Sequence, residues 1–225
     1  MLINKFDYAP VPRDSVDGVR LYQLPSGARV PSVTTILDAT KPDDKKQILA
    51  NWKARVGDDA AKQISTEAAN VGTLMHRMLE EYCRGESKKA GGNMIQQQAS
   101  KMSKVIIEQG LVDMDECWGL EAPLYYDGIY AGTTDFVGVW KGMPSIIDFK
   151  QTNKPKKDDW IDDYRIQLAA YATAHNKMYG TNIQRGVILM CSRALEFQHW
   201  VVEGEEFEKW TSVWWDRVEQ YFNQS

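Results

Sequence analysis

Three consecutive strand-like segments constrain the fold of this chain more than any other part of its sequence. Residues 118–126, 128–140 and 144–151 are rich in Tyr, Ile, Val and Phe, and only turns containing Gly or Pro separate them. β-Branched and aromatic residues between such turns are typical of strands. We therefore expect three antiparallel strands in succession, and the remaining segments must pack against the sheet that they form.

Helical patterns stand before and after these strands. The strongest covers residues 65–83, where apolar side chains recur at intervals of three and four. Two further strands are expected at 183–192 and 196–202. The other expected elements are a hairpin at 19–30 with its turn at Pro25-Ser26-Gly27, helices at 33–37 (capped by Ser32), 43–56, 94–109, 158–179 and 205–222, and a loop or lid at 83–93.

The order of these elements predicts an α+β fold with a mixed sheet. A chain of 225 residues fits a single domain and is long enough to bury a sizeable core. Its first part, 1–110, is expected to hold the hairpin and a helical region. The second part, 111–225, is expected to form a β-rich core with a closing helix.

Composition argues against several classes of protein. No stretch approaches the roughly 18 apolar residues of a membrane span, and the N-terminus lacks a signal-peptide pattern, so a cytoplasmic protein is expected. The cysteines Cys83, Cys117 and Cys191 are scattered and form no CxxC pair. This pattern opposes a disulfide framework, a zinc site or an iron–sulfur cluster, and it favours buried thiols.

The distribution of charge leaves two interpretations open. A net charge of −4 is unfavourable for a nucleic-acid-binding protein taken as a whole, because phosphate contacts need Lys and Arg. Basic residues nevertheless cluster locally, which fits either a basic channel on an acidic body or ordinary solvated faces. These clusters are Lys41, Lys45, Lys46, Lys53 and Arg55; Lys88 and Lys89; and Lys154, Lys156 and Lys157.

The strands around Asp135 and Asp148 carry the strongest chemical signal. A hairpin whose turn is centred on Lys141-Gly142 places the two carboxylates directly opposite each other, with Cβ atoms roughly 4.5–5.5 Å apart. Like charges this close destabilise a sheet unless a cation lies between them, and Mg²⁺ or Mn²⁺ prefers oxygen ligands. Lys150 shares the face of Asp148, two residues away. We therefore predict a divalent metal site; the alternative is a surface hairpin with alternating polar and core residues.

The strand motif Asp135, then a hairpin, then Asp148-Phe149-Lys150, resembles that of the PD-(D/E)XK nuclease superfamily. The second acidic position is Asp148 rather than Glu, which the superfamily permits. The resemblance implies a restriction-endonuclease-like core, in which helices flank a central mixed sheet, together with a helical N-terminal region.

Two further elements narrow the resemblance to RecB-like exonucleases. Gly72 and His76 match the GxxxH element of that branch, and Gln167 and Tyr171 match its QxxxY element. The matching elements cover about residues 66–175. Both pairs lie four residues apart on a helix and therefore on one face. Glycine at position 72 would let another backbone approach closely.

The resemblance assigns roles to these residues. Gln167 and Tyr171 would help to position the metal site and the DNA strand, and they are counted with Asp135, Asp148 and Lys150 as catalytic. Glu121, on the first strand, is a further carboxylate that reaches for the site or for a second ion. The implied ligands of Mg²⁺ or Mn²⁺ are His76, Asp135, Asp148 and the Phe149 carbonyl, with Glu121 as a further candidate from its place on the strand.

Within this branch, the chain is similar to the group that includes the mitochondrial genome maintenance exonuclease and its bacteriophage relatives. In that group the substrate is single-stranded DNA, threaded through a channel that the N-terminal helices cover. Lys154, Trp52 and Trp160 are candidate DNA contacts, since lysine binds phosphate and tryptophan stacks on bases. Core packing is the alternative for both tryptophans.

We hypothesise metal-assisted hydrolysis of DNA from single-stranded ends, with Lys150 orienting or deprotonating the attacking water. The process would be replication, recombination or repair in a bacterial or phage-infected cell, with a protein of these pathways as a candidate partner. Two alternatives remain: a DNA-binding or assembly subunit without activity, and a structure- or sequence-specific endonuclease.

Overall fold

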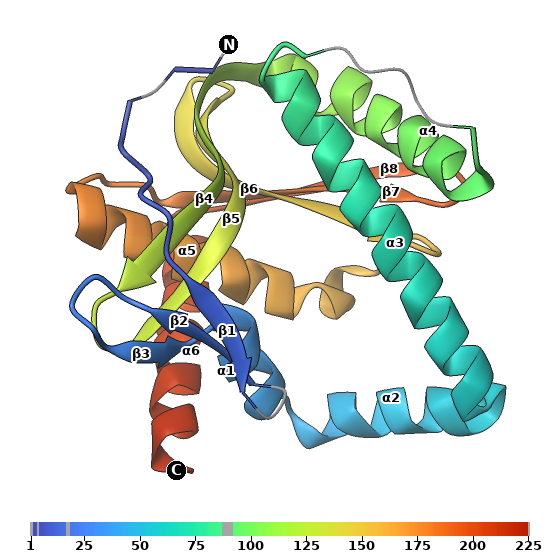
Figure 1. Ribbon diagram of the computed structural model, residues 1–225, viewed down its shortest axis with the longest axis horizontal. Coiled ribbons are helices and arrows are strands. Elements are labelled where there is room, and N and C mark those ends of the chain that lie inside the picture. Colours follow the sequence, from blue (N-terminus) through green and yellow to red (C-terminus); the bar gives the residue numbers. More distant parts are fainter. Residues whose placement is uncertain (1, 4, 17–18, 87–91, 225) are drawn as a thin grey trace.

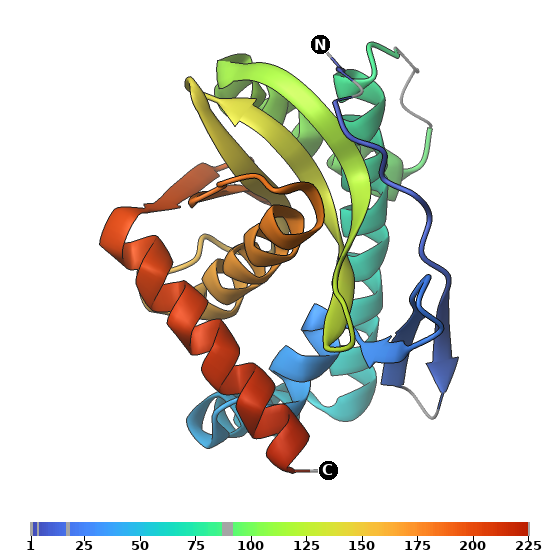
Figure 2. The ribbon, with the colours of Figure 1, turned by 90° about the vertical axis from the view of Figure 1, so that its left-hand side faces the viewer.

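The computed structural model describes residues 2–3, 5–16, 19–86 and 92–224. At its centre is a five-stranded sheet in the order β4-β5-β6-β7-β8, and helices cover both faces (Figure 1 and Figure 2). This confirms the expected α+β class with a central mixed sheet flanked by helices. Residues 87–91 of the predicted loop or lid, including Lys88 and Lys89, lie outside the described residues.

Only one pair of neighbouring strands in the central sheet is parallel. Helix α5 (Asp162–Tyr179) crosses over between β6 and β7, which run parallel, whereas short turns join the antiparallel neighbours. The predicted antiparallel succession is therefore confirmed. The strands are β4 (Met114–Tyr126), β5 (Tyr130–Trp140), β6 (Met143–Thr152), β7 (Arg185–Ser192) and β8 (Phe197–Glu203).

Two hydrophobic cores lie on opposite faces of this sheet because side chains alternate along each strand. On one face, α3 (Asp58–Cys83) and α4 (Met94–Gln109) pack against residues that include Ile147. On the other face, α5 and α6 (Gly204–Asn223) pack against residues that include Ile146. Figure 2 shows the sheet between these two helical layers. The alternation fixes the face that each β6 side chain takes.

A small second sheet precedes the helices, formed by β1 (Arg13–Val16), β2 (Val19–Gln23) and β3 (Arg29–Pro31). The predicted hairpin is the β2–β3 pair. The sequence does not predict β1, because Arg13, Asp14 and Ser15 are polar and exposed and show no apolar alternation.

The predicted helices α1 (Val33–Ala39) and α2 (Asp43–Val56) are both present. Ser32 caps α1, since its hydroxyl accepts a hydrogen bond of 2.9 Å from the Thr35 N–H. The apolar positions of α2 do not enter a core: none is buried, and Ile48 is 66% exposed. Figure 1 shows α2 at the edge of the molecule, where it connects α1 to the long α3.

The structure moves two predicted helix starts. The α5 helix begins at Asp162, because the 158–160 segment forms the 3₁₀ turn η2 (Asp158–Trp160), while another 3₁₀ turn, η1 (Leu111–Asp113), precedes β4. Helix α3 begins at Asp58, ahead of the expected residue 65. The sequence does not indicate this earlier start, because the first two turns are largely exposed and show little apolar periodicity.

The three cysteines are free and buried, as expected. All of them lie in the core beneath α3 and α4. Among the described residues, no helix combines the length and apolar character that crossing a membrane requires.

Candidate metal centre

The register between β5 and β6 is the predicted one. Phe136 pairs with Ile147 and Trp140 pairs with Met143, so Asp135 and Asp148 occupy the next facing positions. The regular ladder stops before them. In its place, the Asp135 carboxylate accepts a hydrogen bond of 2.7 Å from the Phe149 N–H. Asp135 is thus held by the backbone of the strand that carries Asp148.

Asp148 and Lys150 form a buried ion pair on β6. The Lys150 Nζ lies 2.5 Å from Asp148 Oδ2, and Asp148 is 2% exposed. Because Ile147 and Phe149 enter the core beneath α3 and α4, strand alternation turns Asp148 and Lys150 toward α5. The predicted shared face is confirmed.

Helix α5 contributes a chain of polar contacts to Lys150. The Lys150 Nζ donates to Gln167 Oε1 at 3.4 Å, and Gln167 Nε2 donates to the Tyr171 hydroxyl at 3.1 Å. The ring of Tyr164 lies 4.9 Å from the same Nζ. We did not predict a role for Tyr164 from the sequence; its position three residues before Gln167 on one helical face is the signal that would reveal it.

The packing of Tyr171 requires a glycine on β5. A Cβ added at Gly132 would lie 2.6 Å from Tyr171 Cε1, closer than non-bonded carbon atoms approach. The segment that leads to Asp135 therefore passes directly against the ring of Tyr171.

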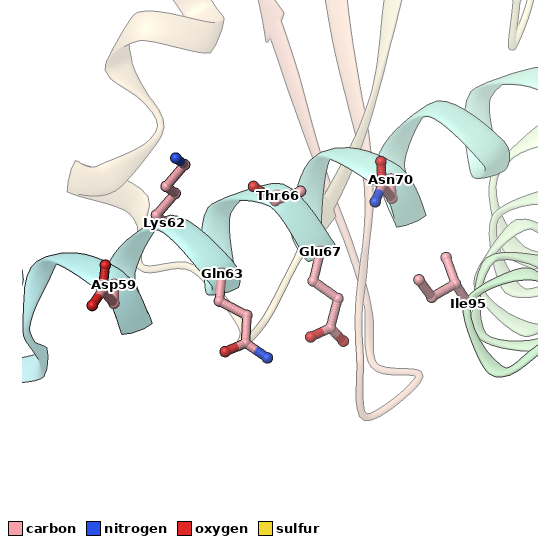
Figure 3. A pocket seen from close by; sticks show the side chains of 7 residues that line it. All are labelled: Asp59, Lys62, Gln63, Thr66, Glu67, Asn70 and Ile95. Carbon is pink, nitrogen blue, oxygen red and sulfur yellow. The ribbon is translucent and has the colours of Figure 1, made fainter.

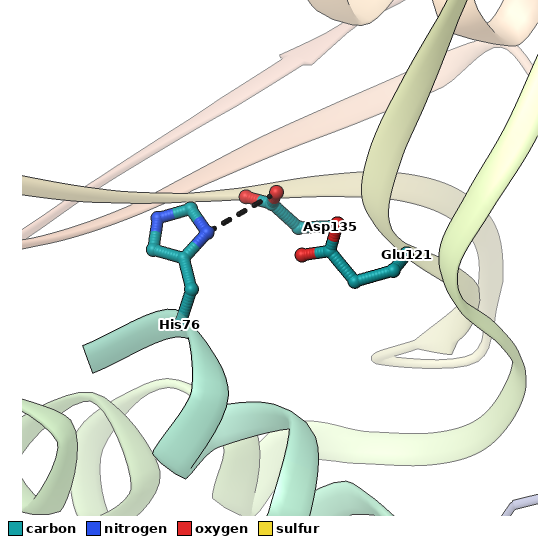
Figure 4. Close-up of side chains that lie close together, drawn as sticks. All are labelled: His76, Glu121 and Asp135. Carbon is teal, nitrogen blue, oxygen red and sulfur yellow. Dashed lines mark ion pairs between the residues drawn. The ribbon is translucent and has the colours of Figure 1, made fainter. Parts of the chain in front are cut away.

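A second group of ligands faces Asp135 from the other side. One potential ligand atom each from His76, Glu121 and Asp135 lie within 4.8 Å of one another (Figure 4). The His76 Nδ1 is 3.3 Å from Asp135 Oδ1. Glu121 faces Asp135 in the β4–β5 register, between the Leu120–Phe136 and Ala122–Thr134 pairs. Its φ of 46° is in the left-handed region, which costs roughly 1–2 kcal/mol in a residue other than glycine.

Negative charge is in excess in this group. Burial raises the pKa of Asp148 to about 6; Lys150 opposes this shift and the charge of Asp135 adds to it. Burial and then the charge of Asp135 raise the pKa of Glu121 to about 6. The Glu121 side chain is exposed as a whole, so water screens part of this effect.

The protonated, positively charged forms of His76 and Lys150 are stabilised by these carboxylates. Burial alone would raise the pKa of Asp135, but His76 and Lys150 lower it. Burial also acts against protonation of His76 and Lys150, yet Asp135 raises the pKa of His76 and Asp148 raises the pKa of Lys150. The group therefore attracts positive charge.

These residues fit a divalent ion. An imidazole nitrogen with several carboxylate oxygens suits Mg²⁺ or Mn²⁺, and a cation there would offset the charge that raises the pKa of Glu121 and Asp148. The sequence places Glu121 on the first strand without fixing its distance from the site; the structure brings its carboxylate within 4.8 Å of the ligand atoms of His76 and Asp135. Asp148 is instead engaged with Lys150.

The remaining predicted residues lie on α3, on α2, on β6 and on the loop that follows β6. The His76 ring meets the Phe149 ring edge-on at 6.2 Å. Gly72 admits no backbone, contrary to expectation: the nearest atom to an added Cβ is a side-chain carbon of Gln151, at 3.4 Å, because α3 packs on a side chain there. Lys154 and Trp160 are exposed on the loop between β6 and α5, and Trp52 is half-buried on α2.

A separate hollow lies along α3, between its start and His76 (Figure 3). Its walls carry charges of both signs and amides, and none of its lining residues belongs to the carboxylate group. The cluster around Asp135 and Asp148 is therefore the better candidate for a reactive site, and the hollow is a groove in the surface. The lining residues are Asp59, Lys62, Gln63, Thr66, Glu67, Asn70 and Ile95.

Comparison with known proteins gives relatives of one kind. No family model matches the sequence. The chain is 27% identical over 203 residues to mitochondrial genome maintenance exonuclease 1 of Mus musculus, covering 85% of this chain and 59% of that protein. It is 25% identical over 205 residues to the protein of the same name from Homo sapiens, covering 85% and 58%. The chain thus spans about three fifths of the length of these relatives.

The mixed sheet flanked by helices and the Asp148–Lys150 pair on it agree with the resemblance of the sequence to PD-(D/E)XK nucleases. More narrowly, its sequence relates it to the mitochondrial genome maintenance exonucleases, at 25–27% identity to the mouse and human proteins. Together these observations support a PD-(D/E)XK-like nuclease relationship.

Proposed function

We propose that this chain is a metal-dependent deoxyribonuclease that removes nucleotides from the ends of single-stranded DNA. The observation that carries the proposal is the buried Asp148–Lys150 pair beside Asp135, with His76 and Glu121 facing the same carboxylate. A fold gains little from burying so many opposed charges unless they serve a ligand. Relatives named exonucleases support the same activity.

The proposed ligands of Mg²⁺ or Mn²⁺ are His76, Asp135, Asp148, the Phe149 carbonyl and Glu121. Such an ion supplies positive charge against the phosphoryl oxygens and lowers the pKa of a water molecule. The side chains supply its place: the Phe149 N–H fixes Asp135, and Asp135 in turn lies next to the His76 ring.

Lys150 acts as a hydrogen-bond donor in this proposal. Its ammonium group has three N–H bonds, and among the described residues its hydrogen-bond acceptors are the Asp148 carboxylate and the Gln167 amide oxygen. A donor therefore remains for a phosphoryl oxygen or for the attacking water. The Tyr164 ring and the Gln167–Tyr171 hydrogen bond hold the ammonium in place. Charge developing on the phosphate would then meet a preorganised cation.

The preference for single strands is supported by the N-terminal helices. Lys45 of α2 forms an ion pair of 2.8 Å with Asp162, at the start of α5. Helix α3 continues from α2 and carries His76. Helix α2 is thereby tied to the start of α5, the helix of Gln167, and α3 to Asp135, an arrangement suited to a narrow passage for one strand. A role in replication, recombination or repair follows from such an activity.

The test is degradation of end-labelled DNA in Mg²⁺ or Mn²⁺. Lys150→Ala and Asp148→Asn should each lower the rate on single-stranded oligonucleotides at least about 100-fold. The matched control is Lys104→Ala on α4, whose side chain is 72% exposed and remote in sequence from the motif. A closed circular single strand should resist the wild type, whereas an endonuclease would cut it. Undiminished activity in both variants would overturn the proposal.

A further inference from the structure

An exposed tryptophan stands on the loop between β6 and α5. Trp160 is 54% exposed, while the other seven tryptophans of the chain are buried or half-buried. Singly exposed apolar residues are common on protein surfaces, so the exposure of Trp160 gains meaning only from what surrounds it. Its position matters here because this loop follows the strand of Lys150 and precedes the helix of Gln167.

Two lysines flank the ring without covering it. The Nζ atoms of Lys156 and Lys157 lie 6.0 Å and 5.6 Å from the Trp160 ring centroid. These distances are at the outer limit for a cation–π contact, so the lysines contribute little to holding the ring. They instead place positive charge next to an open aromatic face. An aromatic ring beside cations is the combination that binds a base and its phosphates.

The loop is held by two neighbouring elements and by a hydrogen bond within its own backbone. Gln198 of β8 accepts a hydrogen bond of 2.8 Å from the Lys156 N–H and donates one of 2.9 Å to the Lys156 carbonyl. Arg165 of α5 donates to the Asp158 carbonyl at 2.9 Å and also binds the Asp158 carboxylate. The Trp160 N–H donates to the Lys157 carbonyl at 3.1 Å. A loop fixed in this way loses little conformational entropy on binding.

The loop also lies near the candidate metal centre. Asp162 and Gln167 are five residues apart on α5, which corresponds to about 7–8 Å along the helix. Tyr164, between them, lies against Lys150. A strand whose phosphate is at Lys150 would therefore reach Trp160 within a few nucleotides.

We propose that Trp160, with Lys156 and Lys157, forms a stacking site for an unpaired nucleotide of the DNA strand. This inference rests on the proposed nuclease function and names the feature of the substrate that the enzyme recognises. A base can stack on Trp160 only after it leaves its neighbours, which costs more in a duplex than in a single strand. The site therefore favours single strands without reading their sequence.

The experiment measures binding separately from cleavage. Asp148→Asn provides a background without hydrolysis, and labelled single-stranded and duplex oligonucleotides are titrated by fluorescence anisotropy. Trp160→Ala in this background should weaken single-strand binding by roughly 5- to 150-fold and leave duplex binding nearly unchanged. The matched control is Phe222→Ala, an aromatic residue 45% exposed at the end of α6, which should change neither.

Two further measurements separate stacking from general surface effects. A single abasic site moved along the oligonucleotide should weaken binding at one position, and Trp160→Ala should remove that dependence. Lys157→Gln should reduce the slope of log affinity against log salt by about one unit. Single-strand binding by Trp160→Ala equal to that of Phe222→Ala would overturn the inference, as would an equal loss with duplex.

The two proposals fail in different ways. If the wild type binds single strands in a Trp160-dependent manner but hydrolyses nothing in Mg²⁺ or Mn²⁺, the nuclease proposal fails and the stacking site stands. If Lys150→Ala abolishes hydrolysis while Trp160→Ala binds normally, only the stacking site fails.

Discussion

His76 and His175 lie in contrasting surroundings, and the contrast separates function from stability in this fold. His175 on α5 is fully buried; its Nε2 contacts the Tyr8 hydroxyl at 2.9 Å and its Nδ1 contacts the Thr181 hydroxyl at 2.8 Å. Its partners are neutral, and aromatic rings surround it. His76 instead faces Asp135 and Glu121.

The buried polar groups of the two regions are compensated by different kinds of partner. Around His175 each polar atom has a neutral partner, and burial, with Lys5 adding to it, lowers the pKa of the imidazole to about 4. Around His76 the partners are charged, and Asp135 raises its pKa against the effect of burial. A satisfied neutral network stabilises a fold, whereas opposed carboxylates destabilise it until a cation arrives. The comparison predicts that the regions respond oppositely to mutation, acid and metal.

The largest effect on stability is expected at His175. His175→Ala should lower the free energy of unfolding by about 2–4 kcal/mol, because the hydroxyls of Tyr8 and Thr181 lose a buried partner. Urea denaturation measures this change. His199→Ala is the control, since His199 is exposed on β8 and should cost less than about 0.5 kcal/mol. Equal effects at the two positions would refute the structural role of His175.

Acid should act with opposite sign on the two regions. His175 has a pKa of 6.5 when unfolded and about 4 when folded. The folded protein therefore loses stability as the pH falls through this interval, because the imidazole takes up its proton more readily in the unfolded chain. Folded-state pKa values of about 6 for Asp148 and Glu121 exceed their ordinary values, so protonation there adds stability as the pH falls from about 6.

This difference can be measured on His175→Gln. Between about pH 7 and pH 4, the wild type should lose about 2–3 kcal/mol relative to this variant. Urea midpoints at several pH values provide the measurement. Parallel pH profiles for the two proteins would show that His175 titrates alike in the folded and unfolded states.

The smallest expected effect is at Glu121. Glu121→Gln removes one of the facing carboxylates and should stabilise the metal-free protein by about 0.5 kcal/mol at neutral pH, a value kept small because the side chain is exposed. Thermal unfolding without and with Mn²⁺ tests it, since the gain should vanish when the ion is present. Glu108→Gln on α4, next to Lys104, is the control and should give no gain. A metal-free variant less stable than the wild type would contradict the repulsion between Glu121 and Asp135.

The sequence predicts the centre of the site better than its edges. The short turn at Lys141-Gly142 sets the β5–β6 register, so the facing of Asp135 and Asp148 follows from local spacing. Glu121 depends on β4, where the register shifts between Met114 and Glu116 and again between Cys117 and Gly119. No periodic pattern indicates such bulges.

Contacts between distant segments are hidden for a related reason. Tyr8 meets His175 across 167 residues of sequence, and neither residue stands in a motif. Likewise, the apolar spacing of α2 predicts its helix but not that Ile48 stays exposed, because exposure depends on which layer covers it. Local spacing thus predicts elements and motifs, while tertiary packing decides which polar groups meet.

Binding of Mn²⁺ to the metal-free protein tests the central claim most directly. In a titration followed by the EPR signal of the free ion, the wild type should show saturable binding, which His76→Ala and Asp135→Asn should weaken at least about 100-fold. His175→Gln should bind as the wild type does, since the side-chain partners of His175 are the Tyr8 and Thr181 hydroxyls. Unchanged Mn²⁺ binding by His76→Ala and Asp135→Asn would contradict the assignment of this group as a metal centre.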